Sequence, residues 1–172
     1  MLRDGSGNKR TSYDMPGSDT HPSNYTELFS DGYTSEFKDF VMSHDVVVIK
    51  SCYPNSDIKD DTELAKIKKE YTTIAGFFGD RPEKKLIIMT SPPLRPTSTT
   101  SANAARAGQL VDWLKSTELA KNVSVFDFFH LLSGSDNYLK KEYRRFIWLD
   151  NHPNKKASDR IAQKWLKYVQ ML

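Results

Sequence analysis

Residues 45–58 read DVVVIKSCYPNSDI, and this stretch decides the fold. Its four consecutive β-branched residues lack the alternation of a half-exposed strand, which predicts a strand buried on both faces. The PNSD turn at 54–57 then ends the strand. A second run of this kind, KKLIIMT at 84–90, leads into SPPLRP at 91–96, which can continue neither a strand nor a helix. Such runs are typical of parallel strands covered by helices on both sides.

Amphipathic segments surround these two strands. Residues 60–80 place apolar side chains at spacings of three and four, with acidic residues at the front, which predicts a helix. Ser35 is a suitable N-cap for a helix before the first strand. The later segments 101–120 and 155–172 are also predicted to be helical. Three of these helices have side chains that are expected to face the core. They are Phe37, Phe40 and Val41 in the helix after Ser35, Leu110, Trp113 and Leu114 in 101–120, and Ile161, Trp165, Leu166 and Val169 in 155–172.

A third strand is predicted in NVSVFDFFHLL at 122–132, with its core from Val123 to Phe128. Apolar strands that alternate with amphipathic helices indicate a layered α/β fold with a parallel sheet. Residues 1–24 show no hydrophobic period and are rich in turn-forming residues, so we expect an irregular N-terminal arm. Residues 25–172 are then predicted to form a single α/β domain.

The predicted sheet is thin. Three strands fall below the usual number of about 4 to 6, so the strand at 46–50 is expected at or near an edge. An exposed apolar edge invites pairing with another chain. Three arrangements remain open from the sequence: the N-terminal arm covers the edge, a partner such as a second copy covers it, or the chain is a fragment whose preceding strands are missing.

Composition narrows the function classes. The chain has 172 residues and a net charge of +3 that is spread along its length, which argues against nucleic acid as the main partner. With Cys52 as the sole cysteine and no metal-type histidine spacing, we expect no disulfide and no metal site. No Gly-rich phosphate loop is present, so no cofactor is predicted. The sequence as written shows neither a signal peptide nor a membrane span, which predicts a soluble protein of unknown compartment.

Three polar residues are candidates for a site, because ligands of open α/β sheets bind beyond the carboxyl ends of the strands. His152, in the turn LDNHPN, can act as a general base, with Asp150 fixing its tautomer. Asn55 follows the first strand and can donate to a developing oxyanion. The alternative is an ordinary loop histidine and a plain turn asparagine. Ser51 and Cys52 end the same strand, but neither lies in a Gly-x-Ser-x-Gly elbow.

Taken in order, five segments resemble successive segments of the SGNH (GDSL-like) hydrolase family, from about Asp45 to near the C-terminus. They are VVVIKSCYPNSDI, KLIIMTSPPLRP, SANAARAGQLVDWL, NVSVFDFFHLL and DNHPNKKASDRIAQ. The resemblance implies a flavodoxin-like three-layer α/β/α fold. It also implies hydrolysis of acyl or acetyl esters of carbohydrate or lipid. By this resemblance, Asn55 corresponds to the oxyanion-hole donor of the family. His152 corresponds to its catalytic base, and Asp150 corresponds to the acidic partner of that base.

The chain departs from the family pattern in two places. The family usually places the aspartate three residues before the histidine, where this chain has Leu149. Its serine nucleophile follows a first strand in a Gly-Asp-Ser segment, which is not found before residue 45. Asp4-Gly5-Ser6 has these residue types in another order without a preceding strand, so Ser6 is not predicted to be the nucleophile.

We therefore expect an SGNH-like ester hydrolase that is truncated or catalytically weakened, and whether it is an enzyme stays open. The first alternative is a non-catalytic α/β module that binds a glycan or a partner protein. The second is an interaction protein that forms a homo-oligomer through the exposed strand edge. The expected ligand of the hydrolase is a small-molecule or glycan ester.

Overall fold

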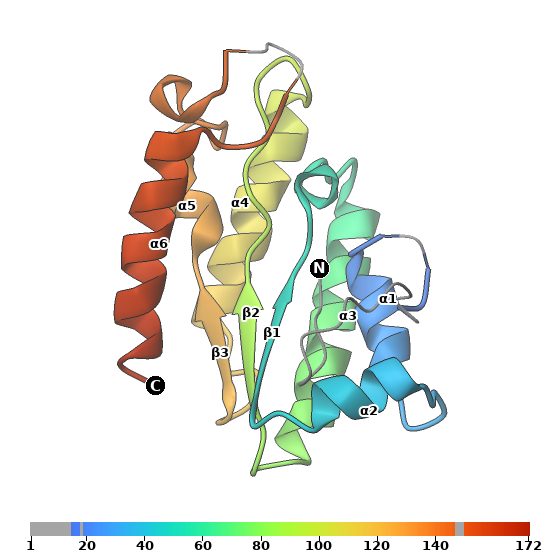
Figure 1. Ribbon diagram of the computed structural model, residues 1–172. Coiled ribbons are helices and arrows are strands. Elements are labelled where there is room, and N and C mark those ends of the chain that lie inside the picture. Colours follow the sequence, from blue (N-terminus) through green and yellow to red (C-terminus); the bar gives the residue numbers. More distant parts are fainter. Residues whose placement is uncertain (1–14, 18, 147–149) are drawn as a thin grey trace.

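The computed structural model describes residues 15–17, 19–146 and 150–172, and Figure 1 shows how their elements are arranged. Ser6 and Leu149 lie outside these ranges. In chain order the elements are α1 (Pro22–Leu28), α2 (Glu36–Met42), β1 (Val46–Lys50), η1 (Tyr53–Ser56), α3 (Asp61–Gly79), β2 (Lys85–Met89), α4 (Ser101–Ser116), β3 (Val123–Phe126), α5 (Phe128–Leu132), η2 (Lys141–Tyr143) and α6 (Lys155–Val169), where η is a 3-10 turn.

The three strands form one parallel sheet in the order β1-β2-β3. Val46 is paired with Lys85 at the start of β1, and Leu86 is paired with Val123 at the start of β3. Helices α3 and α4 connect successive strands, as parallel pairing requires. The predicted parallel α/β sheet of three strands is therefore confirmed.

Side-chain alternation along β2 divides the core into two layers. Leu86 and Ile88 point to a cluster shared with α1, α3 and α4, whereas Ile87 points to a second cluster shared with α6. All three residues are fully buried. Figure 1 shows α6 on one side of the sheet and α1, α3 and α4 on the other. The fold is thus a flavodoxin-like three-layer α/β/α arrangement, as the sequence predicted.

Polar side chains cap the starts of α2, α3, α4 and α6, and Ser35 is the cap that the sequence indicated. The Ser35 hydroxyl accepts a hydrogen bond from the backbone N–H of Lys38, and the Asn154 amide oxygen accepts one from Ala157. Asp60 and Thr100 cap α3 and α4 in the same way. Each cap satisfies one of the N–H groups that lack an intrahelical partner.

The prediction that β1 is buried on both faces is wrong. Val46 and Val48 are 48% and 44% exposed, although Val47 and Ile49 are buried. Helix α6 packs on β2 and β3 and leaves this face of β1 open. The predicted edge position of β1 is confirmed. Association of copies through this edge stays a prediction, which a size measurement in solution would test.

Two further predictions of burial and length are wrong. The third strand ends at Phe126 rather than Phe128, because the Asp127 carboxylate accepts a hydrogen bond from the His130 N–H and starts α5. In α6, Ile161 is buried but Leu166 is 60% exposed. The helix covers only a narrow part of a three-stranded sheet, so one flank of its apolar stripe faces solvent.

Helix α1 starts inside the range 1–24 that was expected to be irregular. Pro22 occupies the first helical position, where its missing N–H and fixed φ are suited to a helix start. The His21 ring caps the helix by accepting a hydrogen bond from the Ser23 N–H. A helix of seven residues has too few turns to show a hydrophobic period in the sequence. The division into arm and domain stays a prediction.

Candidate functional site

His152 and Asp150 form a tight pair in the turn before α6. The ring Nδ1 of His152 lies 2.6 Å from the carboxylate Oδ1 of Asp150, and the His152 backbone N–H donates to the same oxygen at 2.8 Å. These two hydrogen bonds, followed by the nearby Arg145 guanidinium, hold the pKa of Asp150 below its usual value. An ionised Asp150 fixes the neutral imidazole with its proton on Nδ1. The Nε2 of His152 then carries the lone pair that a general base needs.

Two arginines anchor this turn. Arg145 pairs with the second oxygen of Asp150 at 3.1 Å. The backbone N–H of Arg95, in the loop after β2, donates to the side-chain oxygen of buried Asn151, and the Arg95 guanidinium donates to the Arg145 carbonyl. Arg95 is only 5% exposed, and burial lowers its pKa. The loop after β2 therefore fixes the turn that carries Asp150 and His152.

Asn154 ties the same turn to the preceding 3-10 turn. Its side-chain NH₂ donates to the carbonyls of Glu142 and Arg144, at 2.9 and 3.1 Å, while its oxygen caps α6. The Asn154 backbone N–H also donates to the Tyr143 carbonyl. One side chain thus joins η2 to α6 directly after His152.

We expect Asn154→Ala to lower the free energy of unfolding by about 2–3 kcal/mol, because the variant loses an N-cap and two further hydrogen bonds. Asn154→Asp is the matched comparison, since it keeps the cap acceptor but cannot donate to Glu142 and Arg144. Urea denaturation should place it between the wild type and Asn154→Ala. Equal stability of all three proteins would show that these contacts contribute nothing.

Asn55 lies in η1, directly after β1, and η1 contacts the His152 turn. The rings of Tyr53 and His152 meet edge to face, with centroids 5.1 Å apart. The side-chain NH₂ of Asn55 donates to the Thr20 carbonyl oxygen at 3.4 Å. The structure therefore brings the loop of Asn55 and the turn of His152 to the same edge of the sheet, although Asn55 and His152 share no direct contact.

Ser51 is not available as a nucleophile in this structure. It is 1% exposed, and its hydroxyl lies 3.2 Å from the hydroxyl of Tyr71. Burial raises the pKa of Tyr71 to about 12, so the phenol keeps its proton. The pair satisfies two buried hydroxyls in the core.

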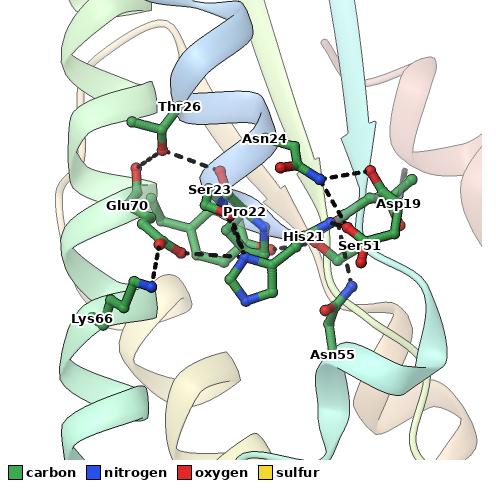
Figure 2. A network of polar contacts seen from close by, with 12 residues as sticks. Asp19, His21, Pro22, Ser23, Asn24, Thr26, Ser51, Asn55, Lys66 and Glu70 are labelled. Carbon is green, nitrogen blue, oxygen red and sulfur yellow. Dashed lines mark hydrogen bonds and ion pairs between the residues drawn. The ribbon is translucent and has the colours of Figure 1, made fainter. Parts of the chain in front are cut away.

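Figure 2 shows a second polar network beside Asn55, formed by α1, the segment before it and α3. The His21 Nδ1 lies 2.8 Å from the Ser23 hydroxyl and 3.9 Å from the Glu70 carboxylate. Lys66 lies 4.0 Å from the other oxygen of Glu70. Both partners of His21 meet the same ring nitrogen, whereas a Ser-His-acid triad uses one nitrogen for each. The geometry is that of a helix cap beside a buried acid.

Glu70 is the buried acid of this network, and its hydrogen bonding is incomplete. It is 8% exposed, and its Oε2 has no hydrogen-bond partner. Burial raises the pKa of Glu70, and the nearby His21 and Lys66 offset this only in part. The folded protein therefore holds the Glu70 proton to higher pH than the unfolded chain does.

Between the unfolded pKa of Glu70 and its raised folded pKa, the folded state binds more protons than the unfolded chain. The free energy of unfolding should therefore fall as the pH rises through this window. Glu70→Gln should remove this effect. We expect the stability difference between Glu70→Gln and wild type to be more favourable to the variant at pH 7 than at pH 4, measured by urea unfolding. Glu36→Gln, at an exposed position of α2, is the control. A pH-independent difference for Glu70→Gln would contradict the prediction.

The sequence missed several residues of this region. Tyr53 and Arg95 contact the His152 turn, and Asn151 lies within it. His21 follows Thr20, the hydrogen-bond partner of Asn55, and pairs with Glu70. Tyr53 could have been found as the aromatic residue in the turn that carries Asn55. Asn151 lies between Asp150 and His152, in the turn that the sequence had singled out. Arg95, His21 and Glu70 come from segments far apart in the chain, and no local spacing marks them.

No group of three or more His, Cys, Asp or Glu side chains gathers as a metal site within the described ranges. In the same residues, no helix is long and apolar enough to cross a membrane.

Comparisons with known proteins support the fold. No model of a known family and no curated protein matches the chain. Among solved structures it is similar to a crystal structure from Bacteroides fragilis described as a "putative acylhydrolase". The two chains are 15% identical, the match covers 87% of this chain and 70% of the other, and the TM-score is 0.61. At this identity the likeness concerns the fold alone, and it agrees with the α/β arrangement described above.

Proposed function

We propose that this domain is an SGNH-like hydrolase that acts on acyl or acetyl esters of a carbohydrate or lipid. The observation that carries the proposal is the Asp150–His152 pair, whose Nδ1–Oδ1 distance is 2.6 Å. The pair lies against the loop after β1, at the carboxyl edge where open α/β sheets bind ligands. The likeness to the Bacteroides fragilis structure supports the same class of activity.

In the proposed reaction His152 Nε2 takes a proton from the attacking hydroxyl group or water. The oxygen of that nucleophile forms a bond to the ester carbonyl carbon, and the carbonyl oxygen becomes an oxyanion. The Asn55 NH₂ group donates to this oxyanion. When the intermediate collapses, the bond to the alkoxy oxygen breaks and His152 returns the proton to the leaving alcohol.

We propose a weakened hydrolase because no serine or cysteine of the described residues is hydrogen-bonded to His152. Water is then the available nucleophile. Serine hydrolases that lose a triad member keep on the order of 10³ to 10⁴ of rate over water, from the rest of their sites. We expect this domain to accelerate ester hydrolysis over the reaction in water by a factor of that order.

The lack of a serine or cysteine hydrogen-bonded to His152 among the described residues also favours a second candidate. This is a non-catalytic module that uses the carboxyl-edge loops to bind a glycan or partner protein. The His152 side chain is 56% exposed, so it is accessible to such a ligand. The hydrolase would turn over an ester and the binding module would not, so an assay of ester hydrolysis separates the two.

Hydrolysis of p-nitrophenyl acetate by the full chain tests the proposal. We expect release of nitrophenolate above the buffer rate, and loss of most of that rate when His152 is replaced. Labelling with a fluorophosphonate followed by peptide mapping would identify any serine that acts as nucleophile. Hydrolysis no faster than in buffer would contradict the hydrolase and leave the binding module.

A further inference from the structure

Thr20 accepts hydrogen bonds from two donors near the carboxyl end of β1. Its hydroxyl accepts from the backbone N–H of Cys52 at 2.8 Å, and its carbonyl oxygen accepts from the side-chain NH₂ of Asn55 at 3.4 Å. The donors lie at the end of β1 and in η1, whereas Thr20 precedes α1. One residue from a distant segment thus supplies acceptors both to Asn55, the proposed oxyanion donor, and to the neighbouring backbone N–H of Cys52.

The small cavity beside Asn55 does not fit an acyl group. The enclosed cavity that Asn55 lines with Tyr71 and Thr90 has a volume of about 10 Å³. That is about the volume that a single water needs. An acyl ligand that accepts from Asn55 does so outside this cavity, and in the arrangement argued below it takes the place of the Thr20 carbonyl.

The segment that carries Thr20 is held by contacts on both sides. The Asp19 carboxylate accepts hydrogen bonds from the His21 N–H and the Asn24 side chain, each at 2.8 Å. On the far side, the Tyr25 hydroxyl donates to the Lys50 carbonyl at 3.0 Å. In Figure 2 the Asn55 side chain points toward the segment of Asp19 and His21. The contacts of Asp19 are polar and exposed, whereas Tyr25 lies in the core, so the residues just before α1 can move at a lower cost than the helix itself.

We propose that Cys52 N–H and the Asn55 amide form a binding site for a 3-hydroxyacyl group, and that Thr20 fills this site as an internal mimic of the ligand. The carbonyl and hydroxyl oxygens of Thr20 are separated by the Cα and Cβ carbons, the same spacing as in a 3-hydroxyacyl ester. The ligand's hydroxyl replaces the Thr20 hydroxyl at Cys52, and its carbonyl replaces the Thr20 carbonyl at Asn55. This inference rests on the proposed function for the role of Asn55 and names the acyl class.

Binding of methyl 3-hydroxybutyrate to the full chain, followed by ¹⁵N–¹H NMR, tests the proposal without requiring turnover. Thr20→Ala removes the hydroxyl that competes for Cys52, so the closed form loses one hydrogen bond. We expect this variant to bind the ester about 5-fold more tightly than wild type, with the largest shifts at the Cys52 amide and the Asn55 side chain. Without ligand, the Cys52 amide of Thr20→Ala should exchange with solvent faster than in wild type.

Thr26→Ala is the matched control. Thr26 lies in α1, and its hydroxyl donates to Pro22 and Glu70 carbonyls rather than to the site. It should bind within about twofold of wild type. Methyl butanoate, which lacks the hydroxyl, should bind Thr20→Ala about 5-fold more weakly than methyl 3-hydroxybutyrate does.

Equal affinity of Thr20→Ala and wild type, equal affinity of the variant for both esters, or no binding by any protein would overturn the proposal. These outcomes are separate from failure of the hydrolase. If the hydrolysis rate does not depend on His152 while Thr20→Ala binds more tightly, the binding site stands and the catalytic role of His152 is rejected.

Discussion

Replacing His152 with alanine is expected to reduce kcat/KM for p-nitrophenyl acetate by about 100-fold, at the lower end of the usual contribution of a positioned general base. The variant loses the Nε2 lone pair, whereas the fold keeps its core, because the His152 side chain is largely exposed. The variant keeps the backbone N–H of residue 152, which is the largest cause of the lowered pKa of Asp150, but loses the side-chain hydrogen bond, so the pKa of Asp150 should rise in part. The measurement is the initial rate at fixed enzyme concentration, with the pKa of Asp150 followed by NMR.

His44→Ala is the matched control for this prediction. His44 is an exposed histidine before β1, and its ring Nδ1 lies 2.9 Å from the Phe40 carbonyl. Its replacement removes an imidazole of the same kind from the opposite end of the strand, so the hydrolysis rate should stay at the wild-type value. If both histidine variants retain the wild-type rate, the base is another group and the proposed mechanism fails.

Replacing Phe78 with alanine is expected to lower the free energy of unfolding by about 3–5 kcal/mol. Phe78 is fully buried at the end of α3, and its ring lies 4.9 Å from that of Phe29 and 5.5 Å from that of Phe77. The variant loses the apolar contact and leaves a cavity between α1 and α3 that close-packed neighbours fill only in part. Urea denaturation with far-UV circular dichroism measures the change.

Phe146→Ala makes the same chemical change at a residue that is fully exposed. Its free energy of unfolding should lie within about 0.5 kcal/mol of wild type. A loss of similar size at Phe146 and Phe78 would mean that the core between α1 and α3 is not the source of the stability lost in Phe78→Ala.

The layered fold could be predicted because each strand is a short apolar run and each long helix has a regular stripe. The run at 46–49 predicted the strand, and the small number of strands predicted that it lies at or near an edge. The run could not predict which face α6 leaves open, because coverage depends on where a helix from the far end of the chain packs. Helix α1 was missed for a different reason: seven residues give too few turns to establish a period.

For the candidate site, the sequence could predict which loops reach the carboxyl edge, and thus named Asn55, Asp150 and His152. The local spacing of Asp150 and His152 was enough to predict the contact that the structure shows at 2.6 Å. The Thr20 contact to Asn55 joins positions 35 residues apart. No pattern in one sequence indicates such a contact, because it is made by backbone and amide groups that many residue types could supply.

The sheet order has a consequence for how the chain is made. Among the residues that the structure describes, β1 pairs with β2 alone, and roughly forty residues separate the ends of these strands. At a synthesis rate of about 5–20 residues per second, β1 is outside the ribosome for about 2–8 seconds before its partner follows. During that interval VVVIK has both apolar faces and both edges free. Until β2 follows, this segment is an unpaired apolar strand on the nascent chain, and its half-open face stays partly exposed after folding.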